Sequence, residues 1–482
     1  MLPRVLILSV SAGAGHKAAA AALEKQFIAT GRCAEVRNID ALDFTSDIYR
    51  TLYSDLYFSL VKQVPWLIGL QYKANDLPFD EPQILRLVDR LNAEPLVKLI
   101  DQYDPDITIC THFLPAKIIS LLIARKELHT RLSVVTTDYD FQGIWLSSLF
   151  NRYFVAIDET RAHMVGLGLP NERITVSGIP VSPAFSVPTD CAATLAQYQL
   201  RPDLPTLLIS AGAAGGGYTR DIVSQVMSLG NPFQAVVVCG NNSELRDEIS
   251  AMVAPQPERF RVLGYTNDMP NLLRIASLFV GKPGGLACSE CMAAGLPMFI
   301  VNPIPGQEER NSDHLLEAGA AVRCNYRTTI GYKIGSLLDD PERLQRMCEA
   351  AHRLGRPDAA QVIVEMALND QSDPLEISEV AQKQILAAAK YGSPDIIDDS
   401  QIHPILLYHD QSGMLVNAIT EDQLAQLGQY LVLERPGDDN YFFTIETIEL
   451  LRERGIDTEL LRPIETIVTE QGEATIRWTR RS

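Results

Sequence analysis

The side chains with the clearest potential for chemistry lie in residues 281–321, with the sequence GKPGGLACSECMAAGLPMFIVNPIPGQEERNSDHLLEAGAA. Gly284 and Gly285 follow an apolar run typical of a strand and precede a helical pattern, so their backbone could approach a phosphate closely. Lys282 supplies a cation beside them. Glu290 falls on the first turns of the helix, where a carboxylate can accept the two hydroxyls of a ribose. The stretch therefore predicts a site for a nucleotide diphosphate.

A polar loop after the next predicted strand, residues 303–311, extends this site. In a parallel α/β sheet such a loop lies at the carboxyl edge, where ligands bind. Gln307 and Glu308 offer the hydrogen-bond donors and acceptors that a hexose ring needs, and Asn311 ends the loop. The alternative interpretation is an ordinary strand–helix–strand unit with a polar surface loop. The density of polar groups favours a nucleotide-sugar site.

Two further glycine-rich loops each lie between a predicted strand and a predicted helix: residues 11–16 (SAGAGH) and 211–217 (AGAAGGG). Small residues there let backbone N–H groups point at an anion or a polar group. His16 could act as a general base or orient a hydroxyl. The alternative for His16 is a residue that only caps the helix. The second loop could bind a diphosphate or could be a tight turn without a ligand.

These loops must be positioned by two α/β domains, because apolar runs typical of buried parallel strands alternate with helical patterns. Strands are predicted at residues 5–10, 36–39, 106–110, 133–137 and 153–157, and again at 206–210, 235–239, 260–263, 278–280 and 298–301. A proline-rich passage at 178–188 predicts the linker. We expect one domain over residues 1–180 and a second over 181–372.

Residues 373–482 do not continue the alternation of strand and helix patterns, and they predict a small α+β module. We expect a hairpin at 403–410 and 414–419, helices at 420–430, 445–454 and 458–461, and a strand at 476–478. The module has 9 Lys+Arg against 20 Asp+Glu, so it carries −11 of the net charge of −18. His403 and His409 have no partners at ligand spacing. We therefore expect a structural role or the binding of a protein partner.

Composition excludes several classes of function. A chain of 482 residues is too long for one core, and its acidity makes it a poor nucleic-acid binder. Cys288 and Cys291 form a CxxC without a second pair, so no metal site is expected, and free thiols fit a reducing cytoplasm. We expect neither a signal peptide nor a transmembrane helix, because no run of about twenty apolar residues occurs.

As a set, these segments resemble the diacylglycerol glycosyltransferases (glycosyltransferase family 28), which include monogalactosyldiacylglycerol synthases and processive diacylglycerol glucosyltransferases. The chain is more distantly similar to the GlcNAc transferase of peptidoglycan lipid synthesis. The matching pieces, in family order, are SAGAGHKAAAAAL at 11–23, TDYDFQGIWLSSLFNRYFVAIDETR at 137–161, GIPVSPAF at 178–185, SAGAAGGG at 210–217, VVVCGNN at 236–242, LGYTNDMPNLL at 263–273 and KPGGLACSE…PGQEERN at 282–311. They cover most of residues 4–325 and leave the tail uncovered.

The resemblance implies a GT-B fold, in which two Rossmann-like, doubly wound domains face each other across a cleft. It implies inversion at the anomeric carbon, a UDP-hexose donor and a membrane lipid acceptor such as diacylglycerol, and it requires neither a cofactor nor a metal. It also implies a cytoplasmic protein, peripheral on the inner face of the plasma membrane.

The family pattern assigns a role to each matched position. The Tyr265 region would bind the uracil, and Glu290 the ribose. Gly212, Ala213, Gly284 and Gly285 would bind the phosphates with Lys282, and Gln307, Glu308 and Asn311 complete the donor-binding set on the sugar side. His16 would lie beside the acceptor, and Asp138 is a second candidate for handling the proton. Gly13, Gly15, Trp66 and Trp145 would form the acceptor side.

Three positions depart from the pattern. Ser182 stands where the family has an Arg on the donor side of the linker, so one phosphate contact is in doubt. Gln142 aligns with a segment that often carries a His before the Trp, and GAGH replaces GGGH. Residues 49–72, which include Trp66, resemble the family's acceptor region and could enter a membrane interface or form buried helices.

Two alternative functions fit parts of this pattern. A UDP-GlcNAc 2-epimerase would use the same pair of domains, but residues 281–321 lack the acid-rich GGxQEE pattern of such enzymes. A sugar-nucleotide sensor with little or no activity would fit Ser182 and the acidic tail. The transferase is the function that the sequence favours.

Overall fold

The computed structural model describes residues 2–11, 14–44, 77–79, 94–212, 218–391, 405–411, 415–419, 421–431, 439–456 and 458–480. Contacts divide the chain into a first unit, Met1–Ala389, and a second unit, Lys390–Ser482. Three predicted site residues, Gly13, Trp66 and Ala213, lie outside the described residues, as does the predicted acceptor stretch 49–72.

The first sheet is parallel and has six strands in the order β2-β1-β3-β4-β6-β7. The strands are β2 (Glu35–Asp40), β1 (Arg4–Ser9), β3 (Ile107–Cys110), β4 (Arg131–Val135), β6 (Arg152–Val155) and β7 (Ile174–Val176). Side chains of β1 alternate between two cores because successive residues of a strand face opposite sides. Val5 and Ile7 pack with Phe27, whereas Leu6 and Leu8 pack into the cluster on the other face.

Helices cover both faces of this sheet. One cluster joins β1 to α1 (Ala14–Thr30) and α16 (Ala359–Asn369), and the other joins it to α5 (Glu94–Tyr103) and α6 (Phe113–Ala124). The helix α7 (Asp158–Gly166) follows β6. The predicted doubly wound arrangement is therefore observed in the first domain.

The second sheet repeats the plan in the order β10-β9-β8-β11-β12-β13, all parallel. The strands are β8 (Thr206–Ser210), β9 (Gln234–Val238), β10 (Phe260–Leu263), β11 (Leu278–Gly281), β12 (Met298–Val301) and β13 (Ala321–Cys324). The helices are α8 (Cys191–Gln197), α9 (Thr219–Met227), α10 (Ser243–Val253), α11 (Met269–Ile275), α12 (Gly285–Ala293), α13 (Gln307–Glu317), α14 (Ile330–Leu338) and α15 (Pro341–Leu354). The two sheets give the Rossmann-like pair that the sequence predicts.

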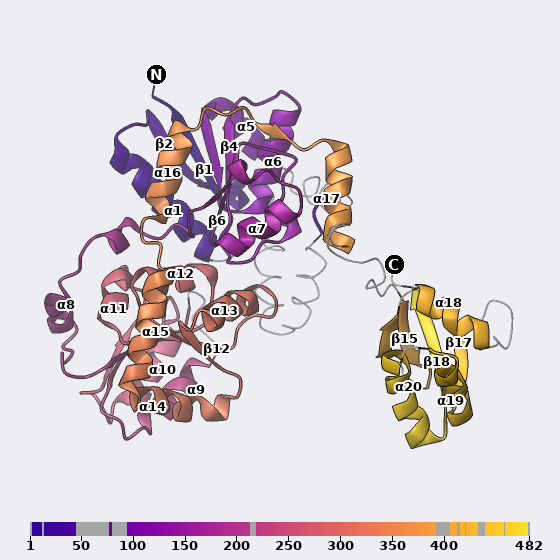
Figure 1. Ribbon diagram of the computed structural model, residues 1–482. Coiled ribbons are helices and arrows are strands. Elements are labelled where there is room, and N and C mark those ends of the chain that lie inside the picture. The colour runs from indigo at the N-terminus through magenta and orange to yellow at the C-terminus, as the bar shows by residue number, and fades with distance from the viewer. Residues whose placement is uncertain are drawn as a thin grey trace. The chain divides into compact units, whose positions relative to one another are not determined.

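After α15 the chain returns to the first domain. Figure 1 shows α16, in orange, beside α1, whereas α15 packs against α12 of the second domain. The two crossings of the chain touch: a Cβ on Gly178 (φ +83°) would lie 2.6 Å from the Cβ of Arg356. The hydroxyl of Ser186 donates to the Pro357 carbonyl at 2.8 Å. The two segments of chain that connect the domains thus cross between them side by side.

The returning chain stays on the first domain up to the end of the unit. Arg173 donates to the Ser372 hydroxyl at 2.6 Å, and β14 (Leu375–Glu376) pairs antiparallel with β5 (Leu149–Phe150). In α17 (Glu379–Tyr391), Ile385 joins the first core. Residues 373–389 therefore pack with the first sheet, and the domain limits inferred from the sequence stay predictions.

The second unit is a small α+β fold with its own core. Its antiparallel sheet has the order β16-β15-β18-β17. The elements are β15 (Ile405–His409), β16 (Leu415–Ile419), α18 (Glu421–Tyr430), β17 (Asn440–Thr444), α19 (Ile445–Glu453), α20 (Thr458–Gln471) and β18 (Glu473–Arg480). The predicted hairpin is formed by β15 and β16.

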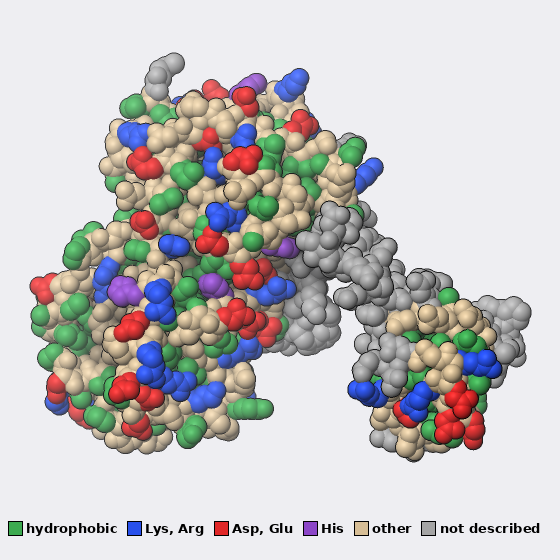
Figure 2. Space-filling view, in the orientation of Figure 1, with side chains coloured by type: hydrophobic (Ala, Val, Ile, Leu, Met, Phe, Trp, Pro, Cys, Tyr) green, Lys and Arg blue, Asp and Glu red, His purple; other side chains and the backbone are tan. Residues whose placement is uncertain are grey.

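Charges of both signs are mixed on the surface of the first unit. The face visible in Figure 2 carries interspersed Lys, Arg, Asp and Glu side chains.

Within the described part of the chain, no helix combines the length and apolar character that crossing a bilayer would require.

Candidate active site

His16 lies on the first turn of α1, directly after β1, where the first sheet presents its carboxyl edge. Its Nδ1 is 2.9 Å from the carbonyl oxygen of Thr111 and 2.8 Å from the hydroxyl of Thr137. A carbonyl can only accept, so Nδ1 carries the proton and Nε2 keeps a lone pair. Desolvation by the surrounding protein lowers the pKa of His16 to about 4. The imidazole is therefore neutral at physiological pH, as a general base must be.

A second histidine, His112, lies beside His16 and was not singled out from the sequence. It precedes α6 as its N-cap, and its Nδ1 accepts from the Leu114 N–H at 3.1 Å. The two imidazole rings are 4.7 Å apart and nearly perpendicular, and burial lowers the pKa of His112 well below its usual range. The signal in the sequence was its position, two residues after the buried strand β3, without a glycine-rich loop to mark it.

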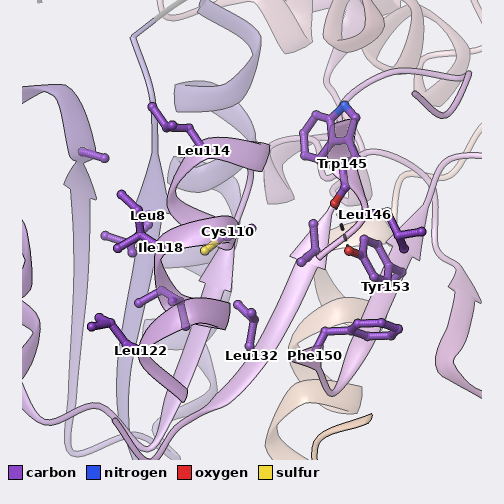
Figure 3. Close-up of a cluster of buried hydrophobic side chains, with 14 of the residues drawn as sticks. Leu8, Cys110, Leu114, Ile118, Leu122, Leu132, Trp145, Leu146, Phe150 and Tyr153 are labelled. Atoms are coloured by element: carbon purple, nitrogen blue, oxygen red, sulfur yellow. Dashed lines mark hydrogen bonds between the residues drawn. The ribbon is translucent and has the colours of Figure 1, made fainter. Parts of the chain in front are cut away.

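Trp145, predicted on the acceptor side, packs against both histidines. Its ring centroid is 6.3 Å from that of His16 and 6.1 Å from that of His112. The side chain is only 4% exposed, and the Trp145 carbonyl accepts from the Tyr153 hydroxyl at 2.9 Å (Figure 3). Trp145 is thus fixed by the first core while its ring borders the candidate base. Gly15 lies in the same turn as His16, and a Cβ on it would be 3.8 Å from Leu286 of the second domain.

The loop between β11 and α12 brings the second domain to this site. Gly284 is the N-cap of α12, and a Cβ on it would meet Glu308 Oε1 only at 3.9 Å. A Cβ on Gly285 would lie 2.1 Å from the Thr137 carbonyl oxygen of the first domain. Gly285 is therefore required by the close approach of the two domains, a reason that the sequence did not reveal. Lys282, beside this loop, is half-buried. Burial raises the pKa of Glu308, and the charge of Lys282 opposes that rise.

Glu290 lies on α12, and no opposing charge or hydrogen bond of the described residues offsets the desolvation of its carboxylate. It is half-buried, and among the residues that the structure describes its carboxylate has no hydrogen-bond partner. Desolvation raises the pKa of Glu290 to about 7. An unpaired, desolvated carboxylate is costly unless donors are supplied. Such a carboxylate is suited to accept the hydroxyls of a ligand.

The first turns of α13 bind the first domain directly. Gln307 donates through Nε2 to Asp138 Oδ2, and Asn311, which is fully buried, accepts from the Tyr139 N–H at 2.9 Å. Arg310 forms an ion pair of 3.1 Å with Asp140. The predicted sugar-side residues Gln307 and Asn311 therefore lie against Asp138, the predicted second candidate for proton handling.

Glu308 and Asp138 differ in how they are satisfied. Glu308 Oε2 accepts from the Ile304 N–H at 2.6 Å, so one of its oxygens already caps its own loop. Asp138 is 7% exposed, and burial raises its pKa to about 6 against the opposing effect of hydrogen bonds from Asn311 and Gln307. Glu308 is thus held by a backbone N–H, and Asp138 is held by two side-chain amides.

The remaining predicted positions lie at the carboxyl edge of the second sheet, at the linker or, for Gln142, in the first domain. Gly212 (φ +74°) follows β8. Tyr265 follows β10, is 67% exposed and donates its hydroxyl to Asn267 at 3.0 Å. Ser182 N-caps the short helix Pro183–Ser186 at 3.4 Å, and Gln142 precedes the turn Gly143–Trp145.

The possible metal ligands that the structure describes around this site are scattered. Over the described ranges, no group of three or more His, Cys, Asp or Glu side chains is arranged to hold a metal ion. Cys288 and Cys291 are buried free thiols of α12, and both pKa values are raised well above the usual range by desolvation. They form part of the core of the second domain.

Sequence relatives cover both domains of this arrangement. The processive diacylglycerol beta-glucosyltransferase of Bacillus cytotoxicus is 32% identical over an alignment of 378 residues that covers 76% of this chain and 94% of that protein. The chain belongs to the diacylglycerol glycosyltransferase family. The enzyme of the same name from Bacillus mycoides is 31% identical over 369 residues, 76% of this chain and 93% of that protein. By family, the chain is a hexosyltransferase.

Family models divide the first unit as the two sheets do. Residues 16–181 match monogalactosyldiacylglycerol (MGDG) synthase, and residues 219–354 match the glycosyl transferases group 1. These matches confirm the resemblance inferred from the sequence. They do not favour the epimerase or the sensor.

Solved structures confirm the GT-B fold. MurG of Acinetobacter baumannii aligns with a TM-score of 0.50 at 17% identity, covering 76% of this chain and 98% of that one. MnaA of S. aureus, solved with UDP, gives 0.50 at 12% identity, covering 76% and 95%.

Gly285→Ala is expected to destabilise the first unit. Its methyl group would lie 2.1 Å from the Thr137 carbonyl and force β4 and α12 apart. We expect the midpoint of thermal unfolding to fall by about 5 °C, since overpacking costs about 1–3 kcal/mol. Gly284→Ala is the matched control, with an ordinary contact at 3.9 Å. An unchanged midpoint for Gly285→Ala would contradict the close approach.

Glu290→Gln is expected to stabilise the ligand-free protein at alkaline pH. The pKa of Glu290 is raised in the folded state to about 7. Between about pH 4.5 and 7 the unfolded chain therefore binds fewer protons, and this residue makes stability fall as pH rises. A neutral amide removes the penalty, so the melting midpoint of the variant should exceed that of the wild type at pH 8 and match it near pH 4. Equal midpoints at both pH values would refute the raised pKa.

Proposed function

We propose that this chain transfers a hexose from UDP-hexose to diacylglycerol, with inversion at the anomeric carbon. The observation that carries the proposal is the match to diacylglycerol glucosyltransferases over both domains. The neutral His16 on the first domain is suited to act as a base, and the unpaired Glu290 on the second is suited to accept hydroxyls of the donor.

His16 is the proposed general base. Its Nδ1–H is engaged by the Thr111 carbonyl, so Nε2 takes the proton of the acceptor hydroxyl. The acceptor oxygen forms a bond to the anomeric carbon while the bond from that carbon to the UDP oxygen breaks, and its electron pair leaves with the diphosphate. The products are the glycolipid, UDP and a proton on His16.

The diphosphate is proposed to lie at the start of α12. The amides of Gly284 and Gly285 and the helix dipole favour an anion there, and Lys282 adds a positive charge. These groups can stabilise the leaving charge by themselves. The proposal therefore includes no cofactor, and UDP-hexose is a substrate.

The nucleoside is proposed to use Glu290 and the Tyr265 region. Two ribose hydroxyls would donate to the Glu290 carboxylate and satisfy it. The exposed ring of Tyr265 offers a surface on which uracil can stack. The hexose would then extend toward Gln307 and Glu308 on α13.

Because diacylglycerol lies in a bilayer, we propose that the chain works at a membrane surface, as a peripheral protein on the cytoplasmic face of the plasma membrane. The second unit lies beyond residue 354, where the family matches end, and has its own core. These facts support a separate role for it, such as binding a protein partner.

The decisive experiment is a donor panel. The protein is incubated with diacylglycerol vesicles and UDP-glucose, UDP-galactose or UDP-GlcNAc, and glycolipid and released UDP are measured. Glycolipid from a hexose donor supports the proposal. Failure to form glycolipid or release UDP with every donor would reject it, and 2-epimerisation of free UDP-GlcNAc would point to the alternative enzyme.

His16→Ala is expected to slow turnover by about 100-fold or more, because general-base catalysis contributes on that order. The dissociation constant for UDP should not change, since His16 lies on the first domain. His129→Ala, an exposed histidine, is the matched control. A His16→Ala variant that keeps more than about a tenth of the wild-type turnover would exclude His16 as the base.

UDP binding is expected to release protons near pH 7. Free Glu290 is about half protonated there, because its pKa is about 7, and hydroxyl donors favour its ionised form. Titration calorimetry in two buffers of different ionisation enthalpy measures the release. Glu290→Gln should abolish it, and release that persists in this variant would exclude the ribose role.

A further inference from the structure

Residues 137–140 belong to the first domain but are held mainly by the second. The Thr137 carbonyl lies over Gly285, and the Tyr139 hydroxyl is 3.2 Å from the Ser289 hydroxyl. Within the first domain, Thr160 donates to the Tyr139 carbonyl at 2.5 Å. The segment is therefore fixed from both sides.

Asp138 is at the centre of an amide network in this segment. Oδ2 accepts from Gln307 Nε2, and Oδ1 accepts from Asn311 Nδ2 at 3.4 Å. Asn311 Nδ2 also donates to the Pro283 carbonyl at 3.1 Å. Its Oδ1 accepts from the Tyr139 N–H at 2.9 Å, which settles the orientation of the Asn311 amide. Both carboxylate oxygens of Asp138 are thus occupied by amide donors.

The occupied carboxylate determines how Gln307 is oriented. An ionised carboxylate only accepts, so Gln307 must turn its NH2 group toward Asp138. Its carbonyl Oε1 then points away from Asp138 and keeps its acceptor capacity. Without that partner the Gln307 amide could rotate by half a turn and exchange its acceptor for a donor.

We propose that Asp138 is a positioning residue for the donor sugar: it fixes the Gln307 amide so that Oε1 accepts from one hydroxyl of the hexose, and it thereby sets the discrimination between UDP-hexoses that differ at a single hydroxyl. This inference rests on the proposed function. It gives Asp138 a different role from the proton handling that the resemblance implies. Discrimination of this kind is large where a buried polar group is left unpaired by the wrong substrate.

The same segment connects the sugar site to the candidate base. Thr137 precedes Asp138, and its hydroxyl is 2.8 Å from His16 Nδ1. Two adjacent residues thus link Gln307 to His16 through hydrogen bonds. Each oxygen of Asp138 already accepts from an amide of the second domain, whereas Nε2 of His16 keeps its lone pair, so the proposal assigns the acceptor proton to His16.

The charges around Asp138 make the orientation of Gln307 sensitive to pH. Burial raises the pKa of Asp138 to about 6, the carboxylates of Glu308 and Asp140 act in the same direction, and the bonds from Asn311 and Gln307 oppose them. Asp140 is paired with Arg310, and Lys282 lies near Glu308. Below about pH 6 a protonated Asp138 can donate to Gln307, so the amide is no longer fixed.

Asp138→Asn tests the proposal, because an amide can donate as well as accept and no longer fixes Gln307. KM and kcat are measured for UDP-glucose and UDP-galactose with diacylglycerol vesicles. We expect KM for the better donor to rise about 10-fold and the ratio of the two kcat/KM values to fall about 10-fold, while kcat changes less than about 3-fold. Gln307→Ala should lower the ratio similarly, and the double variant should add little to either.

Asp140→Asn is the matched control. It removes a cross-domain ion pair next to Asp138 and leaves Gln307 untouched, so the ratio should stay at the wild-type value. If Asp138→Asn instead slows turnover by about 100-fold or more at constant KM, Asp138 is a proton acceptor and the proposal is overturned. An unchanged ratio would also overturn it.

A binding measurement separates this proposal from the proposed function. The dissociation constants of UDP and of each UDP-hexose are compared in wild type and Asp138→Asn by calorimetry. The variant should bind UDP normally and lose the difference between the hexoses. If the wild type transfers no sugar, the proposed function fails, but a lost difference in binding would still support the role of Asp138. Wild-type-like binding in the variant would overturn it.

Discussion

The close contact of the Gly285 backbone with the Thr137 carbonyl is the constraint on which the site depends. Only a residue without a side chain allows α12 to approach the end of β4 so closely. That approach brings α13 within hydrogen-bond range of Asp138 and Tyr139. The candidate base on α1 of the first domain and the helices α12 and α13 of the second domain, which we propose bind the nucleotide sugar, thereby belong to a single polar network. The residues that join the two domains here are therefore also residues of the candidate active site.

The site also illustrates how function is built at the expense of stability. Glu290 and Asp138 are carboxylates whose pKa values are raised by burial, so their ionised forms weaken the fold. His16 loses affinity for a proton for the same reason. In each case removal from water is the largest cause of the shift and disfavours the charged form of the group.

Much of this arrangement could be predicted from the sequence, because long apolar runs and glycine-rich loops are local signals. Both sheets and the strand–loop–helix settings of His16 and of Gly284 and Gly285 followed from them. The short strands β5, β7, β13, β14 and β17 were missed, since two to five residues give too little periodicity. His112 and the bonds from Gln307 and Asn311 to Asp138 were missed because they depend on contacts up to 173 residues apart in the chain. Local patterns carry no information on such contacts.

The two crossings of the chain between the domains have a mechanical consequence. A single flexible tether would let one domain turn about three axes relative to the other. Here the crossing at Gly178 touches the one at Arg356, and Ser186 bonds to Pro357. Two connecting segments held side by side permit rotation of the domains about the line through the two crossings and resist rotation about the other two axes. Rotation about that line is therefore the relative motion that the two crossings restrict least, and the contact of Gly285 with the Thr137 carbonyl defines its closed end.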